Sequence, residues 1–165
     1  MARRKLKFPN REGQIPEGTG RPELAEGEVL VTEEDRRFLR SMYTRSHHLR
    51  ADEPGDKGGS DGGPDPYDLL LMSLGACTSM TLRMYANHKD LPVENIVVRL
   101  RHDRIHAKDC EECETTEGYV SRIERFIHYD GELSDEQHQR LMEIADKCPV
   151  HRTLKGEIRI VTRSE

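Results

Sequence analysis

Four cysteines are the residues of this sequence best suited to covalent chemistry: Cys77, Cys110, Cys113 and Cys148. A cysteine reacts as its thiolate, so it needs surroundings that lower its pKa and admit a substrate. Pro149 suits the first position of a helix, so a helix amino terminus that favours the thiolate is expected directly after Cys148. Cys77 falls within an apolar helix, where desolvation raises a thiol pKa unless a cation or hydrogen bond compensates. Both are candidates for thiol chemistry; the alternative is that both are small buried hydrophobic side chains.

Cys110 and Cys113 form a second candidate site together with two histidines. The pattern His102-x3-His106-x3-Cys110-x2-Cys113 offers the ligand types and number that tetrahedral zinc prefers. At the rise of a β-strand His102 lies about 13 Å from His106, so His106 with the two cysteines is the better ligand set. Four acids flank the cysteines: Asp109, Glu111, Glu112 and Glu114. Their charge raises the thiol pKa values and disfavours a reactive pair. Three interpretations stay open for this loop: no site at all, a zinc site, or a redox pair.

Composition limits the classes of function. The 165 residues are enough for one ordinary domain. Charged residues make up 35% and hydrophobic residues only 34%, which predicts apolar surface shared with a partner chain. A net charge of -5 and a pI near 5.9 argue against a nucleic-acid partner. No uninterrupted apolar run approaches the ~20 residues of a membrane span, and no signal peptide is recognisable. We therefore expect a cytoplasmic protein, a compartment in which structural disulfides are uncommon.

The amino-terminal part is expected to combine an extension with short strands. Residues 1–25 are rich in Gly, Pro and charge and predict a loosely structured extension, which leaves one domain over residues 26–165. Apolar/polar alternation predicts two or three strands, at Glu28–Thr32, Arg37–Tyr43 and Ser46–Arg50. Residues 52–65 are punctuated by Gly and Pro and predict a loop.

A long helix should follow and carry Cys77. Asp65 can cap it, Pro66 suits its first position, and Asp68 favours the positive end of its dipole. The helix is expected to run to about Lys89. Its first four turns have almost no polar face, which predicts burial on all sides as a central core helix and not a membrane span.

The remaining elements alternate between strand and helix. Strands are expected at Leu91–His106, Tyr119–Tyr129 and Glu157–Thr162, with the polar loop Ala107–Gly118 between the first two. Ser134 and Gln137 form a capping box for a second helix. Spacing on that helix directs Cys148 inward, on the face of Leu141 and Ile144.

Two cysteine motifs resemble those of the OsmC/Ohr-like family. The stretch Asp65-Pro-Tyr-Asp-Leu-Leu-Leu-Met-Ser-Leu-Gly-Ala-Cys77-Thr-Ser-Met resembles its central-helix motif, and Cys148-Pro149-Val150 is similar to its second signature. The motifs stand in the family's order, 71 residues apart, and the resemblance covers roughly Glu26 to Thr162. It implies an α+β fold in which antiparallel sheets pack on two long central helices of an intertwined homodimer, with a site at the dimer interface.

The resemblance also implies a redox activity linked to oxidative stress. In peroxidase members the cysteine matched by Cys77 attacks an organic hydroperoxide and becomes a sulfenic acid. The cysteine matched by Cys148 then condenses with it to a disulfide, which an external dithiol reduces. No metal or organic cofactor is required.

Two departures concern the residues that activate the first cysteine. Peroxidase members have a glutamate after the helix-opening proline, whereas this chain has Tyr67, and the nearest acid is Asp68. They also have an arginine in the strand before the long loop, for which Arg50, Arg45 or a protonated His48 are the candidates here. The pattern resembles a distinct OsmC-like branch, some of whose members are fused behind an α/β-hydrolase domain. The opening Lys5–Gln14 also resembles the start of such hydrolase domains.

A second hypothesis is a non-catalytic protein of the same fold. It would hold a small apolar or electrophilic ligand in the interface pocket, with Cys110 and Cys113 as a metal clip. Tyr67 and the missing arginine favour this hypothesis, whereas the two cysteine signatures favour the enzyme.

Overall fold

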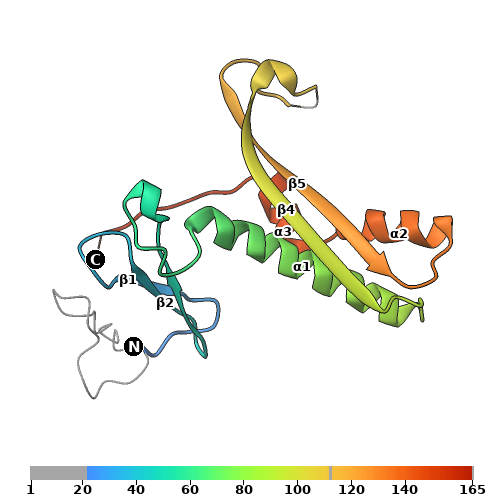
Figure 1. Ribbon diagram of the computed structural model, residues 1–165, viewed down its shortest axis with the longest axis horizontal. Helices are drawn as coiled ribbons and strands as arrows, with labels where there is room; N and C mark the ends of the chain where they lie inside the picture. Colours follow the sequence, from blue (N-terminus) through green and yellow to red (C-terminus); the bar gives the residue numbers. More distant parts are fainter. Residues whose placement is uncertain (1–21, 112, 165) are drawn as a thin grey trace. The chain divides into compact units, whose positions relative to one another are not determined.

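The computed structural model describes residues 22–111 and 113–164, so most of the expected amino-terminal extension lies outside the described residues (Figure 1). The chain divides into two compact units, one ending at Leu69 and the other beginning at Leu70.

The first unit contains a three-stranded antiparallel sheet in the order β1-β2-β3. Its strands are β1 (Leu30–Glu33), β2 (Arg40–Tyr43) and β3 (His48–Ala51). The three expected strands are therefore confirmed, with bounds displaced by a few residues. Val31 pairs with Met42 and Met42 with Leu49, as in a simple meander.

The loop after β3 is organised around the buried carboxylate of Asp52. That carboxylate accepts hydrogen bonds from the Ser60 hydroxyl and from the N–H groups of Ser60, Gly62 and Glu53 at 2.7–3.0 Å. These bonds, led by that of the Ser60 hydroxyl, lower the pKa of Asp52 to about 2. The expected loop is confirmed, and it contains one short 3-10 helix, η1 (Gly55–Lys57).

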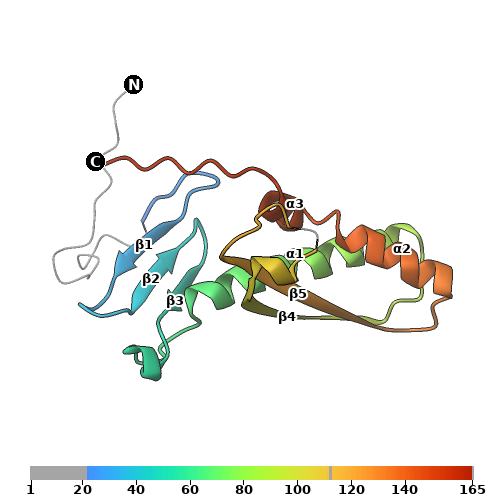
Figure 2. The same ribbon diagram turned by 90° about the horizontal axis from the view of Figure 1, so that it is seen from above.

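The second unit is built on a long hairpin and helices. The strands β4 (Asn95–His106) and β5 (Tyr119–Asp130) pair antiparallel along their whole length, from Asn95 opposite Asp130 to His106 opposite Tyr119. The helices are α1 (Pro66–His88), which starts at the end of the first unit, α2 (Asp135–Ala145) and α3 (Pro149–Lys155). Figure 2 shows α1 and α2 on one face of the β4–β5 ribbon. Their shared core consists of Leu82, Ala86, Val93, Tyr129, Leu141, Ile144 and Ala145.

The helix starts agree with the capping signals. Asp68 N–H donates to the Asp65 carboxylate at 2.8 Å, and Asp65 N–H donates back to Asp68 at 3.3 Å. Ser134 and Gln137 form the reciprocal capping box that their spacing predicts. Local side-chain chemistry therefore specifies both starts.

The burial of α1 differs from expectation. Its buried residues lie on one stripe that includes Leu74, Thr78, Leu82 and Ala86. Met72, Met80 and Met84 are 58%, 66% and 73% exposed, so burial on all sides is wrong for the single chain. One two-stranded ribbon and α2 cover only part of a helix circumference. By length and composition α1 could cross a bilayer, but the core helix of a soluble protein passes the same test.

The expected closing strand is absent. Within the described chain, residues 157–162 have no regular secondary structure. Ile158 and Ile160 are 53% and 85% exposed. Alternation alone predicted this strand, but a strand also needs a neighbouring edge to pair with.

Candidate redox site

Cys77 and Cys148 are brought together in the second unit. Both are free cysteines, Cys77 on α1 and Cys148 directly before α3. A hydrogen bond between the two side chains alters the pKa of both thiols, and the charge of Cys148 also raises the pKa of Cys77. Cys148 is completely buried, whereas Cys77 is partly exposed. The fold thus joins the two thiols that the sequence singled out 71 residues apart.

The two thiols differ in which protonation state their surroundings favour. Burial raises the pKa of Cys77, and the neighbouring Cys148 raises it further. Burial also opposes the Cys148 thiolate, but hydrogen bonding from Cys77, the His151 N–H, the Thr78 hydroxyl and the Val150 N–H outweighs it and lowers the Cys148 pKa. When the pair has lost one proton, the negative charge is therefore favoured on Cys148 and the remaining proton on Cys77.

Arg125 on β5 links the elements around this pair. Its guanidinium donates to the Thr78 hydroxyl at 3.0 Å, to the Ala145 carbonyl at 3.1 Å and to the Asp146 carboxylate at 2.7 Å. The Arg125 side chain is only 13% exposed. Because Thr78 also interacts with Cys148, Arg125 fixes one of the groups that favour the thiolate.

Sequence reasoning missed Arg125, although a signal was present. Alternation along Tyr119–Asp130 places residue 125 on the same face as Ile123 and Ile127, its apolar neighbours on either side in that register. A charged side chain in an inward-facing register needs polar partners. That conflict marks the residue as exceptional.

Asp146 also approaches a histidine next to the site. Its carboxylate lies 3.7 Å from Nδ1 of His151, while burial lowers the pKa of that imidazole. His151 is therefore held close to Cys148 through its backbone and close to Asp146 through its ring.

The three expected activating residues have partners of their own in the first unit or at its end. Arg50 makes a bidentate ion pair with Glu34, at 2.9 and 2.8 Å. Burial raises the pKa of Glu34, but hydrogen bonds from the Ser41 hydroxyl and from Arg50 outweigh it and lower the pKa of that carboxyl. His48 contacts the Ser41 hydroxyl at 3.0 Å and stacks on Tyr43. Asp68 takes part in the cap of α1. Arg50 and His48 thus share one polar cluster, as residues two apart on a strand should.

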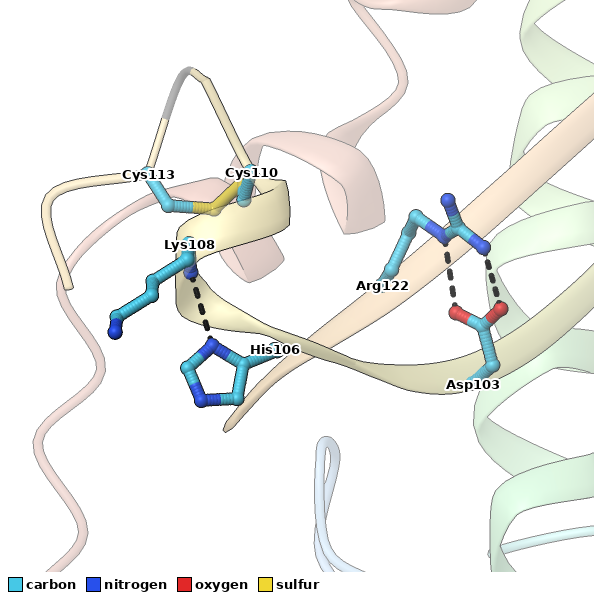
Figure 3. The surroundings of a disulfide bond; sticks show 6 residues. All are labelled: Asp103, His106, Lys108, Cys110, Cys113 and Arg122. Atoms are coloured by element: carbon cyan, nitrogen blue, oxygen red, sulfur yellow. Dashed lines mark hydrogen bonds and ion pairs between the residues drawn. A yellow bond between two sulfur atoms is a disulfide. The ribbon is translucent and has the colours of Figure 1, made fainter. Parts of the chain in front are cut away.

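The expected zinc ligand set is not assembled. Cys110 and Cys113 are joined in a disulfide, with their Cα atoms 5.4 Å apart, so neither sulfur is available as a thiolate ligand. Figure 3 shows the His106 ring turned away from the two sulfurs, where Nδ1 accepts a hydrogen bond from the Lys108 N–H at 3.3 Å. His102 lies further back on β4, opposite Ile123. In the described ranges 22–111 and 113–164, no group of three or more His, Cys, Asp or Glu is arranged to hold a metal.

A family model described as OsmC-like protein matches residues 58–163. Among solved structures, a putative osmotic stress induced and detoxification response protein from Psychrobacter arcticus is 18% identical with a TM-score of 0.61, over 76% of this chain and 85% of that one. An organic hydroperoxide resistance protein OsmC from Legionella pneumophila is 18% identical with a TM-score of 0.57, over 81% and 93%.

A third structure is a putative organic hydroperoxide resistance protein from Vibrio cholerae with captopril bound in one of its active sites. It is 19% identical with a TM-score of 0.56, over 81% of this chain and 88% of that one. No curated protein sequence matches the chain. At identities this low, the structural similarity shows only that the mixed α+β fold with small antiparallel sheets is shared. The family model, however, covers more than half of the sequence. The chain therefore belongs to the OsmC-like protein family.

Proposed function

We propose that this protein is a cysteine-dependent peroxidase that reduces organic hydroperoxides through a Cys77–Cys148 disulfide cycle. The observation that carries the proposal is the direct interaction of two free thiols between α1 and α3. Membership of a family that includes hydroperoxide resistance proteins supports it. The reductant of the cycle is an external dithiol, and the reaction uses no metal or cofactor.

The protonation pattern assigns different tasks to the two cysteines. Cys77 is the partly exposed member, so it meets the peroxide, but its surroundings favour the neutral thiol. When the pair is singly ionised the charge is favoured on Cys148, which then accepts the Cys77 proton. The resulting Cys77 thiolate attacks the O–O bond, forms Cys77 sulfenic acid and releases an alkoxide, which takes a proton to become the alcohol. The Cys148 thiol then attacks the sulfenic sulfur, and water leaves as the disulfide forms.

We propose that two copies of the chain assemble around the exposed face of α1. Met72, Met80 and Met84 form an apolar strip on that face, and exposed apolar patches of this kind mark interaction surfaces. A second copy of α1 matches the strip in chemistry. The net charge of -5 makes nucleic acid an unfavourable partner, and we place the homodimer in the cytoplasm.

A thiol count tests the peroxidase proposal. Because Cys110 and Cys113 are already joined, the folded chain offers two free thiols, and both should disappear on titration with one equivalent of cumene hydroperoxide. Mass spectrometry after alkylation should locate the new bond between residues 77 and 148. In Cys148→Ser, sulfenic acid should instead persist at Cys77 and react with dimedone. Two free thiols remaining after excess peroxide would overturn the proposal.

A second candidate is non-catalytic binding of a small apolar or electrophilic ligand. The raised pKa of Cys77 favours it, because a neutral thiol reacts slowly with peroxide. An apolar maleimide and a hydroperoxide distinguish the two functions. Reaction of Cys77 with the maleimide alone favours binding, and reaction with the hydroperoxide favours the enzyme.

A further inference from the structure

The second cysteine pair lies at the outer end of the β4–β5 ribbon. The 3-10 helix η2 (Ala107–Asp109) follows β4, and Cys110 and Cys113 come directly after it. Both cysteines are partly exposed. In Figure 1 this end of the ribbon projects away from α1 and α2, so a partner can approach it. From Arg125 to Tyr119 the strand runs six residues, about 20 Å, which separates this end from the Cys77–Cys148 pair.

The hairpin does not need the disulfide to hold its end together. Twelve residues of each strand are paired, and the Ala107 N–H donates to the Gly118 carbonyl at 2.8 Å just beyond the last pair. The Cys110 N–H donates to the Ala107 carbonyl at 3.1 Å, which closes the η2 turn. The disulfide itself spans only two intervening residues, and a loop this short gains little entropic stabilisation from a cross-link. A structural staple is therefore a weak explanation for the bond.

Charge around the pair is strongly one-sided. The segment 107–118 contains one lysine, Lys108, and five acids: Asp109, Glu111, Glu112, Glu114 and Glu117. Acidic neighbours disfavour the thiolates of the reduced pair, which favours the disulfide at equilibrium, so the pair is reduced only by a strongly reducing dithiol. The same charge attracts a cationic partner and repels an anionic one.

We propose that Cys110–Cys113 is a thiol–disulfide exchange site, separate from the Cys77–Cys148 pair, which accepts electrons from a dithiol on a positively charged protein surface. A thiolate of the partner attacks one sulfur of the pair, forms a mixed disulfide and releases the other cysteine, which takes up a proton. The second thiol of the partner then closes the partner's own disulfide and releases the remaining cysteine as a thiol. Two electrons and two protons pass to the pair, and the partner becomes oxidised. The proposal does not depend on peroxide chemistry.

Small thiols of different charge test this site in the full chain. Cysteamine is cationic, 2-mercaptoethanol is neutral and 3-mercaptopropionate is anionic. Reduction is followed by alkylation and mass spectrometry of the peptide that holds Cys110 and Cys113, so it is read independently of Cys77. The matched variant Glu111→Gln/Glu114→Gln removes two charges and keeps side-chain size. For each protein, the rates of reduction by cysteamine and by 3-mercaptopropionate are divided by the rate with 2-mercaptoethanol. This ratio removes any change in the acidity of Cys110 and Cys113 that affects all three thiols equally.

We expect reduction of the folded chain with unchanged circular dichroism. Relative to 2-mercaptoethanol, cysteamine should lose at least twofold in rate in the variant and 3-mercaptopropionate should gain at least twofold. Both differences should shrink in 0.5 M salt because exposed charges are screened. Three results would overturn the proposal: reduction only after denaturation, charge-independent rates, or a reduced pair that retains stoichiometric zinc and no longer exchanges.

Discussion

The two cysteine pairs have the same atoms but opposite surroundings. Cys77 and Cys148 come from distant parts of the chain and meet beside the core, where the Thr78 hydroxyl, itself held by Arg125, favours the Cys148 thiolate. Cys110 and Cys113 are neighbours in sequence, partly exposed and surrounded by acids. Residue type alone therefore does not define a redox site. Desolvation, hydrogen bonding and local charge decide which sulfur carries the charge and what can reach it.

The largest difference between the pairs should be seen with peroxide. In Cys77→Ser, peroxide-dependent thiol loss should fall by at least about 10³-fold, because the attacking sulfur is gone. The Cys110–Cys113 disulfide should be unaffected. Stopped-flow peroxide consumption with per-cysteine mass analysis measures both, and Cys110→Ser/Cys113→Ser is the matched control. Equal loss of activity in that control would mean that the pairs act as one system.

Replacing Arg125 should disturb only the core pair. Arg125→Met keeps the length of the side chain but leaves the buried Thr78 hydroxyl and the Ala145 carbonyl without this donor, at a cost of about 2–4 kcal/mol in the free energy of unfolding. Urea denaturation gives this number, and Arg125→Lys should recover part of it. Stability unchanged in the methionine variant would contradict the role assigned to Arg125.

The exposed disulfide should matter less for stability. Cys110→Ser/Cys113→Ser should lower the free energy of unfolding by about 2 kcal/mol or less, because the cross-link closes so short a loop. The same urea denaturation, carried out without reductant, compares this variant with Arg125→Met. A larger loss than in Arg125→Met would identify the disulfide as a structural element after all.

The smallest effect concerns the proton of the core pair. Cys148 has a pKa below its ordinary value of 9.0 and Cys77 a pKa above it, so thiolate absorbance should rise in two steps, one on each side of pH 9.0. Charge on Cys148 therefore adds stability that is fully present above pH 9.0 and is lost as the pH falls through the lower step.

Thr78→Val should move that lower step upward, because it removes a hydroxyl that favours the Cys148 thiolate. It should also cost about 1 kcal/mol of stability. Thr78→Ser keeps the hydroxyl and serves as the control. A single step in the wild type, or an unchanged step in the valine variant, would show that Thr78 does not set the charge distribution.

Much of the fold was predictable from local patterns. The cap at Asp65, the capping box at Ser134 and Gln137, and the alternation of the two long strands all agree with the structure. Predictions that depend on contacts with residues far away in the sequence were less accurate. Residues 157–162 alternate like a strand but have no pairing among the described residues, and the apolar surface of α1 did not reveal which face the chain itself covers.

The candidate site divides in the same way. The sequence motifs identified Cys77 and Cys148. The alternation of residues 119–130 also places Arg125 on the inward face, a signal that the cysteine motifs do not contain. Arg50, His48 and Asp68 were proposed by position alone, and the structure gives them contacts with Glu34, Ser41 and Asp65. Metal ligand types were present around Cys110, but ligand spacing cannot distinguish two thiols from a disulfide.

Local sequence patterns specify the helix starts, the long hairpin, the order of the cysteine motifs and the acidic setting of Cys110 and Cys113. These features depend on neighbours within a few residues, through capping, alternation and local charge. The tertiary fold brings Cys77 to Cys148, links Thr78 to Asp146 through Arg125, and lowers the pKa of Cys148. These depend on distances across the fold and on the removal of water, which no local pattern specifies.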